Sequence, residues 1–536
     1  MNRRGFIKLA SLAAVCRPAW LQAAAAPEIL YNGIQLPPQW PPRYELTALP
    51  ATPPYVSNPP RVINIDVGRQ LFVDDFLIET TTLTRWFHAT TYHEANPILR
   101  PDRSWEQAGS SPTSMVFSDG VIWDPKDGVF KMWYMGGYTR TTCLATSADG
   151  IHWTKPRLDV VPGTNIVLNE PRDSTTVWLD TEESDPERRY KMSLFPLGRA
   201  SNPLTLYVSG DGVHWRAVGQ TGIAGDRSTV FWNPFRRVWA YSIRAGGEVG
   251  EAGRHRRYFE SQTFEARWSA SDAVAWARAD RLDVRRDDTG AIPQLYSLDC
   301  VAYESVLLGL FSIWRGEFPN RPKHNDVCVG FSRDGFHWDR SYRQPILPLS
   351  EREGDWNWAN TQSAGGCCLV VGSKLFFYVS GRRGQQDGSE PGICSTGLAT
   401  MRRDGFASMT PRALPEGTLT TRPVRFSGRY VFVNAETMGG DLRVEVLDEH
   451  GQVLEPYTRS ACVPLRGDDT CHRVTWANDG DIATLAGRPI RFRFFLTRGH
   501  LYAFWVSASV NGASRGYVGA GGPGFSGAID TAGRRA

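Results

Sequence analysis

Residues 147–153 read Ser-Ala-Asp-Gly-Ile-His-Trp, and the same phrase returns at residues 209–215 and 332–338, changed only at its variable positions. Two shorter versions begin at Ser261 and at Arg402. The five copies lie about 50 to 70 residues apart, a spacing that suits four-stranded sheets joined by loops of varying length. The chain is therefore predicted to repeat one structural unit five times.

An alternating apolar run precedes every copy, which is typical of a strand rather than a helix. These runs are residues 130–134, 190–194, 238–242, 308–312 and 375–379. Within the phrase, Asp-Gly favours a tight turn, Ser and Asp side chains can bind the turn backbone, and Trp can fill the gap between neighbouring sheets. The phrase is thus architectural, and it predicts an all-β fold with a five-bladed β-propeller over residues 61–418.

The repeat stops near residue 419, where a different strand pattern begins. Alternating runs at residues 442–447, 488–495 and 501–505 are separated by Gly and Asp turns, which predicts a small β-sandwich domain over residues 419–510. The Gly- and Ala-rich residues 511–536 are expected to be a disordered tail. The Pro-rich residues 27–60 are expected to be an N-terminal linker.

The first 26 residues resemble a twin-arginine export signal. Arg3 and Arg4 are followed by Phe6, Lys8 and an apolar run that ends in the alanines before residue 27. This predicts cleavage near Ala26 and a periplasmic or extracellular protein. No later stretch reaches the ~20 apolar residues of a membrane span.

Charge and cysteine content narrow the choice of partners. Sixty Lys and Arg against 56 Asp and Glu leave a formal charge of only +4, which indicates neither nucleic acid nor an anionic membrane as partner. Nine cysteines show no zinc-type spacing, so no metal site is predicted. Because twin-arginine cargo folds before export, most thiols are expected to be buried and free. Cys462 with Cys471 is the candidate disulfide.

A five-bladed propeller followed by a β-sandwich resembles glycoside hydrolase family 32, and the blades alone are similar to families 43, 68 and 130. Short phrases support the resemblance: Asn-Pro-Ile-Leu at 96–99, Pro-Ile-Leu at 345–347, Trp-Asp-Pro at 123–125 and Trp-Asn-Pro at 232–234. The repeated phrase is also similar to the Asp-box of sialidases, but it lacks the residue between Asp and Gly. The resemblance implies three carboxylates that converge on the propeller axis from the innermost strands and cleave a glycosidic bond.

Matching those positions residue by residue assigns the candidate catalytic carboxylates. Asp173 follows Arg172 as in the Arg-Asp-Pro phrase of family 32, with Ser in place of Pro. Asp226 stands where the family places its acid Glu. In the first unit the family's Asn-Asp-Pro-Asn-Gly phrase is missing, and Asp119 is the candidate nucleophile or base there. Its rival Asp124 is assigned to a turn, because its Trp-Asp-Pro setting recurs as Trp-Asn-Pro in the third unit.

The remaining candidates complete the predicted site. The fourth unit offers Asp299 as a further inner-strand carboxylate. The candidate substrate-binding residues are Arg172, Arg227, Arg244, Trp356, Trp358 and Gln362. No cofactor is predicted, although the resemblance leaves room for a divalent cation in the axial channel.

Together these features predict an exported glycoside hydrolase whose partner is a carbohydrate. Two alternatives stay open: a non-catalytic carbohydrate-binding propeller, favoured by the missing phrase in the first unit, and a lyase or phosphorylase on the same scaffold. The sequence has no P-loop, HExxH or Gly-x-Ser-x-Gly motif, which argues against nucleotide, zinc-protease and serine-hydrolase chemistry. The glycan, the linkage and the oligomeric state are left open.

Overall fold

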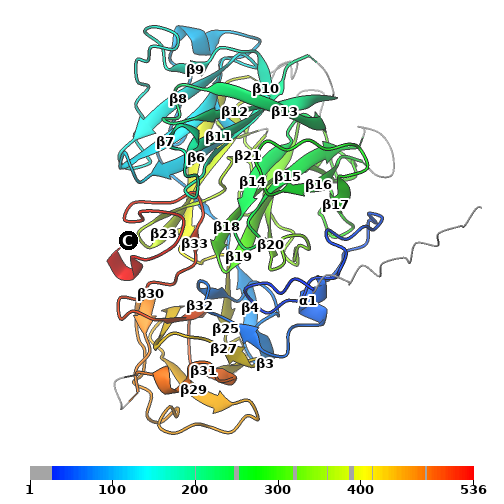
Figure 1. The fold of residues 1–536 in the computed structure, drawn as a ribbon. Coiled ribbons are helices and arrows are strands. Elements are labelled where there is room, and N and C mark those ends of the chain that lie inside the picture. The colour runs from blue at the N-terminus through cyan, green and yellow to red at the C-terminus, as the bar shows by residue number, and fades with distance from the viewer. Residues whose placement is uncertain are drawn as a thin grey trace, which may run out of the picture.

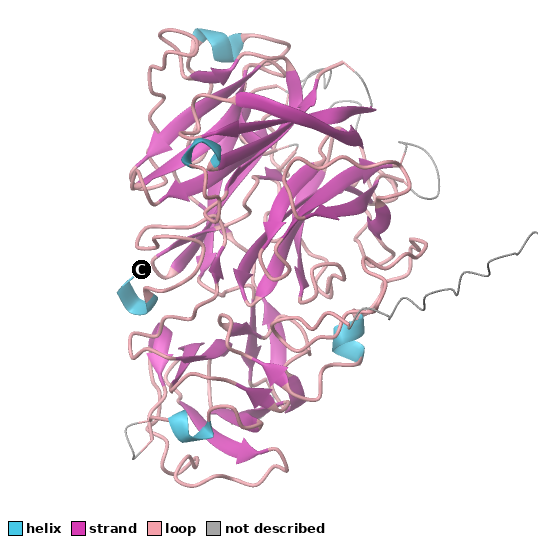
Figure 2. Ribbon diagram, viewed as in Figure 1, coloured by secondary structure: helices cyan, strands magenta, loops and turns pink. Residues whose placement is uncertain are grey.

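The computed structural model describes residues 27–198, 201–246, 253–317, 323–358, 360–384, 392–412, 415–476 and 480–535. Their regular structure is almost entirely β-strand, as Figure 2 shows, which confirms the all-β prediction. The short helices are α1 (Pro54–Ser57), η1 (Ser104–Gln107), η2 (Pro186–Arg188), η3 (Ala483–Leu485) and η4 (Gly533–Arg535). Within these residues no helix is long and apolar enough to cross a membrane. The predicted export signal, residues 1–26, lies outside the described residues.

Five sheets of four or five strands form the upper part of the molecule in Figure 1. Neighbouring sheets contact each other in chain order and the fifth also contacts the first, so the sheets close into the ring of a β-propeller. The first sheet contains β6 (Ser114–Asp124), β7 (Val129–Gly136), β8 (Thr141–Ser147) and β9 (Ile166–Leu168), and the second contains β10 (Arg172–Leu179), β11 (Tyr190–Pro196), β12 (Ser201–Ser209) and β13 (Arg216–Gly225). The third sheet contains β14 (Thr229–Asn233), β15 (Val238–Ala245), β16 (His255–Ser261) and β17 (Val274–Ala277), and the fourth contains β18 (Gln294–Glu304), β19 (Val306–Trp314), β20 (Asn325–Ser332) and β33 (Tyr517–Val518). The fifth sheet contains β21 (Gln362–Ser363), β22 (Leu369–Val371), β23 (Lys374–Arg382), β24 (Cys394–Arg402) and β5 (Thr91–Tyr92).

The repeated phrase builds the turn after the third strand of its sheet. Ser147 Oγ accepts a hydrogen bond from the Gly150 N–H at 2.9 Å. Asp149 Oδ1 accepts from the backbone N–H groups of Ile151 and His152, each at 2.8 Å. Gly150 has a φ of +76°, which favours glycine. Trp153 packs edge-on against Tyr378 of the fifth sheet, with ring centroids 5.7 Å apart. The equivalent contacts between other neighbouring sheets are Trp215 with Trp133 and Trp338 with Trp276. The architectural interpretation of the phrase is confirmed.

Two six-stranded sheets form the lower part of the molecule in Figure 1 and enclose a core in which Phe72, Phe492, Phe494 and Phe504 pack together. The first sheet holds β1 (Ile63–Asn64), β3 (Ile78–Thr81), β26 (Gly417–Thr421), β27 (Val424–Arg425), β29 (Leu442–Asp448) and β31 (Ile490–Leu496), and the second holds β2 (Gln70–Leu71), β4 (Thr84–Phe87), β25 (Ala407–Thr410), β28 (Tyr430–Glu436), β30 (Asp468–Arg473) and β32 (His500–Ser507).

The sandwich differs from its predicted boundaries, because its sheets draw on the beginning of the chain. Strands β1 to β4 belong to the sandwich and not to the propeller, and β25 joins it before residue 419. The Pro-rich residues 27–60 are not a free linker: Leu30, Ile34 and Tyr55 are buried in the sandwich core. Residues 63–87 contain alternating apolar and polar residues like those of the propeller strands, so the sequence did not assign them to the sandwich. Only their pairing with distant strands does so.

The Gly-rich C-terminal segment is ordered through residue 535, contrary to the expected disorder. β33 pairs with β18, and the Trp123 N–H donates to the Ala520 carbonyl at 3.0 Å. A Cβ at Gly522 would lie 1.7 Å from the Val370 carbonyl oxygen. The glycines here therefore permit close backbone approach at the end of the ring where the inner strands terminate, a role that composition alone cannot distinguish from disorder.

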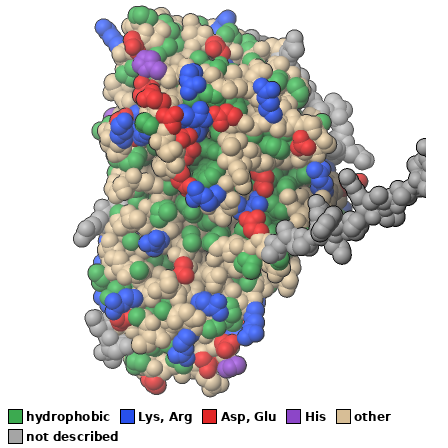
Figure 3. Space-filling model, viewed as in Figure 1, with side chains coloured by type: hydrophobic (Ala, Val, Ile, Leu, Met, Phe, Trp, Pro, Cys, Tyr) green, Lys and Arg blue, Asp and Glu red, His purple; other side chains and the backbone are tan. Residues whose placement is uncertain are grey.

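Acidic and basic side chains are interspersed over the face seen in Figure 3.

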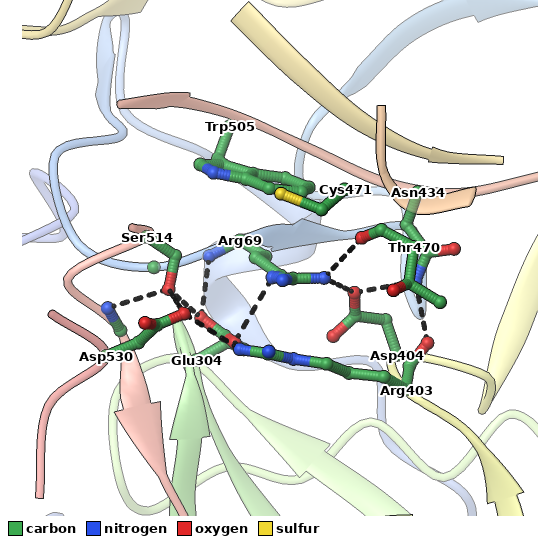
Figure 4. A network of polar contacts seen from close by, with 12 residues as sticks. Arg69, Glu304, Arg403, Asp404, Asn434, Thr470, Cys471, Trp505, Ser514 and Asp530 are labelled. Atoms are coloured by element: carbon green, nitrogen blue, oxygen red, sulfur yellow. Dashed lines mark hydrogen bonds and ion pairs between the residues drawn. The ribbon is translucent and has the colours of Figure 1, made fainter. Parts of the chain in front are cut away.

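A buried ionic network joins the sandwich, the propeller and the C-terminal segment (Figure 4). Arg403 Nη2 lies 3.0 Å from Glu304 Oε1 and 2.8 Å from Asp530 Oδ2. Arg69 Nη1 lies 2.9 Å from Asp404 Oδ2, and its guanidinium carbon is 4.2 Å from the Trp505 ring centroid. These two arginines and three carboxylates are at most 3% exposed. The network fixes the orientation of the two domains, because each charge has its partners on a different segment.

All eight cysteines after Cys16 are buried and free, as expected for a protein that folds before export. The proposed disulfide is wrong: Cys462 lies in the sandwich core, whereas Cys471 packs against Phe432 and Trp505 on the other face of its sheet. We expect dithiothreitol to change Tm by no more than about 1 °C, since loss of a disulfide worth about 2–4 kcal/mol would lower Tm by several degrees. If scanning calorimetry showed a decrease of several degrees on reduction, the protein would contain a disulfide after all.

Candidate active site

The predicted carboxylates and Gln362 lie on the innermost strands or directly before them. Asp119 is in β6, Asp173 is in β10, Asp226 precedes β14, and Asp299 is in β18. Gln362 opens β21. Arg244 lies on the second strand of its sheet, β15.

Asp119 is locked in a buried ion pair with Arg172. Arg172 Nη1 donates to Asp119 Oδ1 at 2.8 Å and Arg172 Nη2 donates to Asp119 Oδ2, and both residues are 0% exposed. Burial raises the pKa of Asp119, while Arg172 acts in the opposite direction. Neither side chain is open to a substrate. The geometry therefore does not support Asp119 as the nucleophile or base, or Arg172 as a substrate contact, and instead makes the pair a positioning element.

Local irregularities aim these side chains. In β6 the pairing shifts register between Met115 and Gly120, and Phe117 has a φ of +44°. In β10 the register shifts between Arg172 and Ser174, so Asp173 is the extra residue of a bulge. A bulge redirects the side chains on either side of it, which sends Arg172 toward Asp119 and leaves Asp173 facing the next sheet.

Asp173 and Asp226 are neighbouring carboxyl groups in different surroundings. Asp173 Oδ1 is buried and has no hydrogen-bond partner among the described residues. Burial raises the pKa of Asp173, and the charge of Asp226 raises it further, against the effects of Arg227 and Arg254. The Asp226 side chain is 29% exposed; its Oδ1 accepts from Arg254 Nη2 at 2.9 Å and lies 3.3 Å from Arg244 Nη1. Such an asymmetric pair supplies one proton donor and one carboxylate.

Asp299 is more deeply set. It is 2% exposed, and its Oδ2 accepts from the Ser363 hydroxyl at 2.6 Å. Burial raises the pKa of Asp299 to about 6, against the opposing effect of Arg227. Arg227 has a φ of +59°, is 0% exposed and places its guanidinium 3.7 Å from the Phe117 ring centroid. Asp299 and Arg227 thus form the floor of the site.

Several residues that sequence reasoning passed over complete the site. Arg254 and Arg256 are buried and face inward, and Arg256 Nη1 donates to the Arg227 carbonyl at 2.8 Å. Arg257 turns the other way and donates to the Ala270 and Ala273 carbonyls. The run of basic residues was the available signal, but a run on a loop is ordinarily solvated. The two-residue period of β16 is what separates its inward arginines from the outward one.

The predicted aromatic contacts are not brought to the carboxylates. The Trp356 ring packs on the glycine backbone of β23 and β24, where a Cβ at Gly381 or Gly397 would lie 2.3 or 2.1 Å from it. It lines a cavity of 560 Å³ with other residues than those around Asp226. Trp358 is only 8% exposed, which leaves little ring surface for a sugar.

The polar candidate of the fifth sheet is fully buried, so it too is not open to a substrate. Gln362 donates to Asn360 Oδ1 at 2.9 Å, while its own Oε1 is buried without a hydrogen-bond partner in the described part of the chain. Across that part, no group of three or more His, Cys, Asp or Glu side chains is placed to hold a metal ion.

Comparison with known proteins adds likeness of fold. No protein-family description matches the chain, and no curated protein matches it. Among solved structures, it is similar to an N-acetylgalactosamine deacetylase from F. plautii in complex with blood group B trisaccharide (TM-score 0.43, 16% identity, 61% of this chain and 97% of that one). It is also similar to a thermostable family-43 glycoside hydrolase (0.40, 11%, 56% and 94%) and to an α-L-arabinofuranosidase from Lactobacillus brevis (0.37, 8%, 57% and 92%).

Several of the similar solved structures are named as glycoside hydrolases. Similarity at this level does not define an activity, so the activity has to be inferred from the site residues around Asp173, Asp226 and Asp299.

Proposed function

We propose that the protein hydrolyses a glycosidic bond, with Asp173 as the general acid and Asp226 as the carboxylate that attacks the anomeric carbon or activates water. The observation that carries this proposal is the asymmetry of the pair. Burial and the charge of Asp226 raise the pKa of Asp173, whose Oδ1 has no hydrogen-bond partner among the described residues, whereas Asp226 contacts two arginines. Glycoside hydrolysis requires one protonated and one ionised carboxyl group that flank the scissile bond.

The surrounding residues would support this chemistry without taking part in bond cleavage. The Asp119–Arg172 pair holds the bulged start of β10, and so the position of Asp173. Ser174 Oγ accepts from the Arg227 N–H at 2.9 Å, which ties the start of the second sheet to the residue beside Asp226. The funnel would therefore hold both carboxyl groups in place before substrate binds.

The test is a screen of the purified protein against a broad panel of polysaccharides and oligosaccharides, with release of reducing ends as the readout. Asp173→Asn and Asp226→Asn serve as matched inactive variants. NMR of the anomer first released tells whether Asp226 acts as nucleophile or as base, since retention requires the former. Turnover of a responsive glycan that survives both substitutions would refute the assignment. Binding of a glycan without any release of reducing ends would instead favour the carbohydrate-binding alternative.

The pH dependence of kcat/KM should identify the proton donor. A general acid works only when protonated, and the raised pKa of Asp173 keeps it protonated to higher pH than an ordinary Asp. We expect kcat/KM to fall as pH rises through this pKa. Asp299, with a pKa of about 6, also titrates below neutrality, so Asp299→Asn is the control. The alkaline limb should persist at the same pH in that variant; its disappearance would transfer the role to Asp299.

Export by the twin-arginine route is part of the same proposal and is supported by the pattern of residues 1–26. The eight buried, free cysteines agree with folding in a reducing compartment before translocation. Fractionation of cells that express the chain, with Arg3→Lys and Arg4→Lys as the blocked variant, tests this part.

A further inference from the structure

Among the described residues, basic side chains gather around the proposed reaction centre. Arg227, Arg254 and Arg256 are all at most 8% exposed. Arg244 and Lys323 lie beside them along the adjoining cavity. Four carboxyl groups lie among these five cations, those of Asp173, Asp226 and Asp299 and that of Glu317 beside Lys323. Asp119 is taken up by Arg172.

Three of these cations, Arg244, Arg254 and Lys323, line one cavity. A space of 160 Å³ is bounded by Arg244, Arg254, Gln294, Tyr296, Trp314, Glu317 and Lys323. The guanidinium of Arg254 lies 3.9 Å from the Tyr296 ring centroid, and Lys323 Nζ lies 5.8 Å from it. The single acidic group in the lining, Glu317, lies 3.5 Å from Lys323. The cavity adjoins Asp226 through Arg244 and Arg254, both of which contact that carboxylate.

The buried arginines repel one another. Burial lowers the pKa of Arg256, and the charges of Arg254 and Arg227 lower it further. Burial also lowers the pKa of Arg227, whose Nε and Nη1 have no hydrogen-bond partner among the residues that the structure describes. Like charges in a water-poor site are costly unless an anion joins them. An anionic ligand would offset this repulsion, whereas a neutral one would not.

We infer that the saccharide bound in this funnel is anionic, and that Arg254, Arg244 and Lys323 hold a carboxylate or sulfate group on the sugar beside the scissile bond. Cleavage of that saccharide rests on the function proposed above, but its binding does not. Guanidinium groups bind both anions in bidentate fashion, so uronate and sulfate ester share the recognising chemistry. Tyr296 supplies a ring against which the sugar face can pack.

The experiment is calorimetric titration of the Asp173→Asn variant, which should bind without turnover, with matched oligosaccharides of one backbone. The set contains a neutral member, a uronate member with its carboxyl-reduced control, and a sulfated member with its desulfated control. We expect an acidic member to bind at least about tenfold more tightly than its neutral control, with an affinity that falls as salt increases. The member that shows this gain identifies the anion. Equal or tighter binding of both neutral controls would overturn the inference.

Variants in the same run of sequence locate the contact. Arg254→Gln should reduce binding of the acidic oligosaccharide about tenfold and leave the neutral one unchanged. Arg257→Gln, whose side chain points away, should alter neither. Lys323→Gln gives a second reading in case Arg254→Gln fails to fold, because the Lys323 side chain is 42% exposed. Loss of affinity that is equal for acidic and neutral sugars would contradict the assignment. Tight acidic binding without cleavage by the wild type would keep this inference and refute hydrolysis.

Discussion

Replacing Asp173 with Asn should lower kcat/KM on a natural glycan by at least about 10³-fold, the range expected when a general acid is removed. Stability should hardly change, because Asn has the same shape and Asp173 Oδ1 has no hydrogen bond to lose among the described residues. Removing this carboxyl also removes its repulsion of Asp226. Steady-state kinetics and scanning calorimetry on the same preparation give the two numbers.

The leaving group separates the roles of the two carboxyls. An aryl glycoside with an acidic phenol needs no protonation when its bond breaks, so Asp173→Asn should retain far more activity on it than on the natural glycan. Asp226→Asn should lose activity on both substrates. Asp127→Asn, in the turn after β6, is the matched control and should behave as wild type. If Asp173→Asn kept its activity on the natural glycan, the general acid would have to lie elsewhere.

The second large effect is expected in the ionic network between the domains. Arg403→Gln should lower the free energy of unfolding by about 3–5 kcal/mol, because it leaves Glu304 and Asp530 buried without their shared cation. The double variant Arg403→Gln with Glu304→Gln should recover part of this loss, since it removes one of the two carboxylates that share Arg403 and leaves Arg69 paired with Asp404. Calorimetry should show the change as a lower Tm for the domains together.

An exposed ion pair provides the comparison for this prediction. Arg61 contacts Glu449 at 3.3 Å, but its side chain is 88% exposed, so Arg61→Gln should move Tm by no more than about 1 °C. Equal shifts for Arg61→Gln and Arg403→Gln would show that burial does not set the strength of the network. A double variant less stable than Arg403→Gln alone would show that Glu304 contributes independently of the arginine.

Local chemistry made the propeller predictable. The turn phrase contains its own hydrogen-bond donors and acceptors within seven residues, as Ser147 and Asp149 show, and an alternating strand precedes each copy. Such interactions depend on neighbours in the chain, so a sequence is enough to place them. The same numbering of units led to Asp173 and Asp299 on innermost strands and to Asp226 just before one.

Other features depended on distant partners, and the sequence carried no mark of them. β5 closes the fifth sheet from the start of the chain, and residues 63–87 belong to the sandwich, because backbone groups pair with any strand that packing brings alongside. The Gly-rich tail is ordered where its backbone meets Val370.

The site divides in the same way. The sequence by itself determined which strands carry the carboxyl groups, since that follows from a local repeat. Only the tertiary structure decided that Arg172 pairs with Asp119 and that Trp358 is buried. It also decided that Arg254 contacts Asp226 while Arg257 points away from that carboxylate. Those outcomes depend on burial and on charges that meet across sheets, and such long-range terms are settled when the whole chain packs.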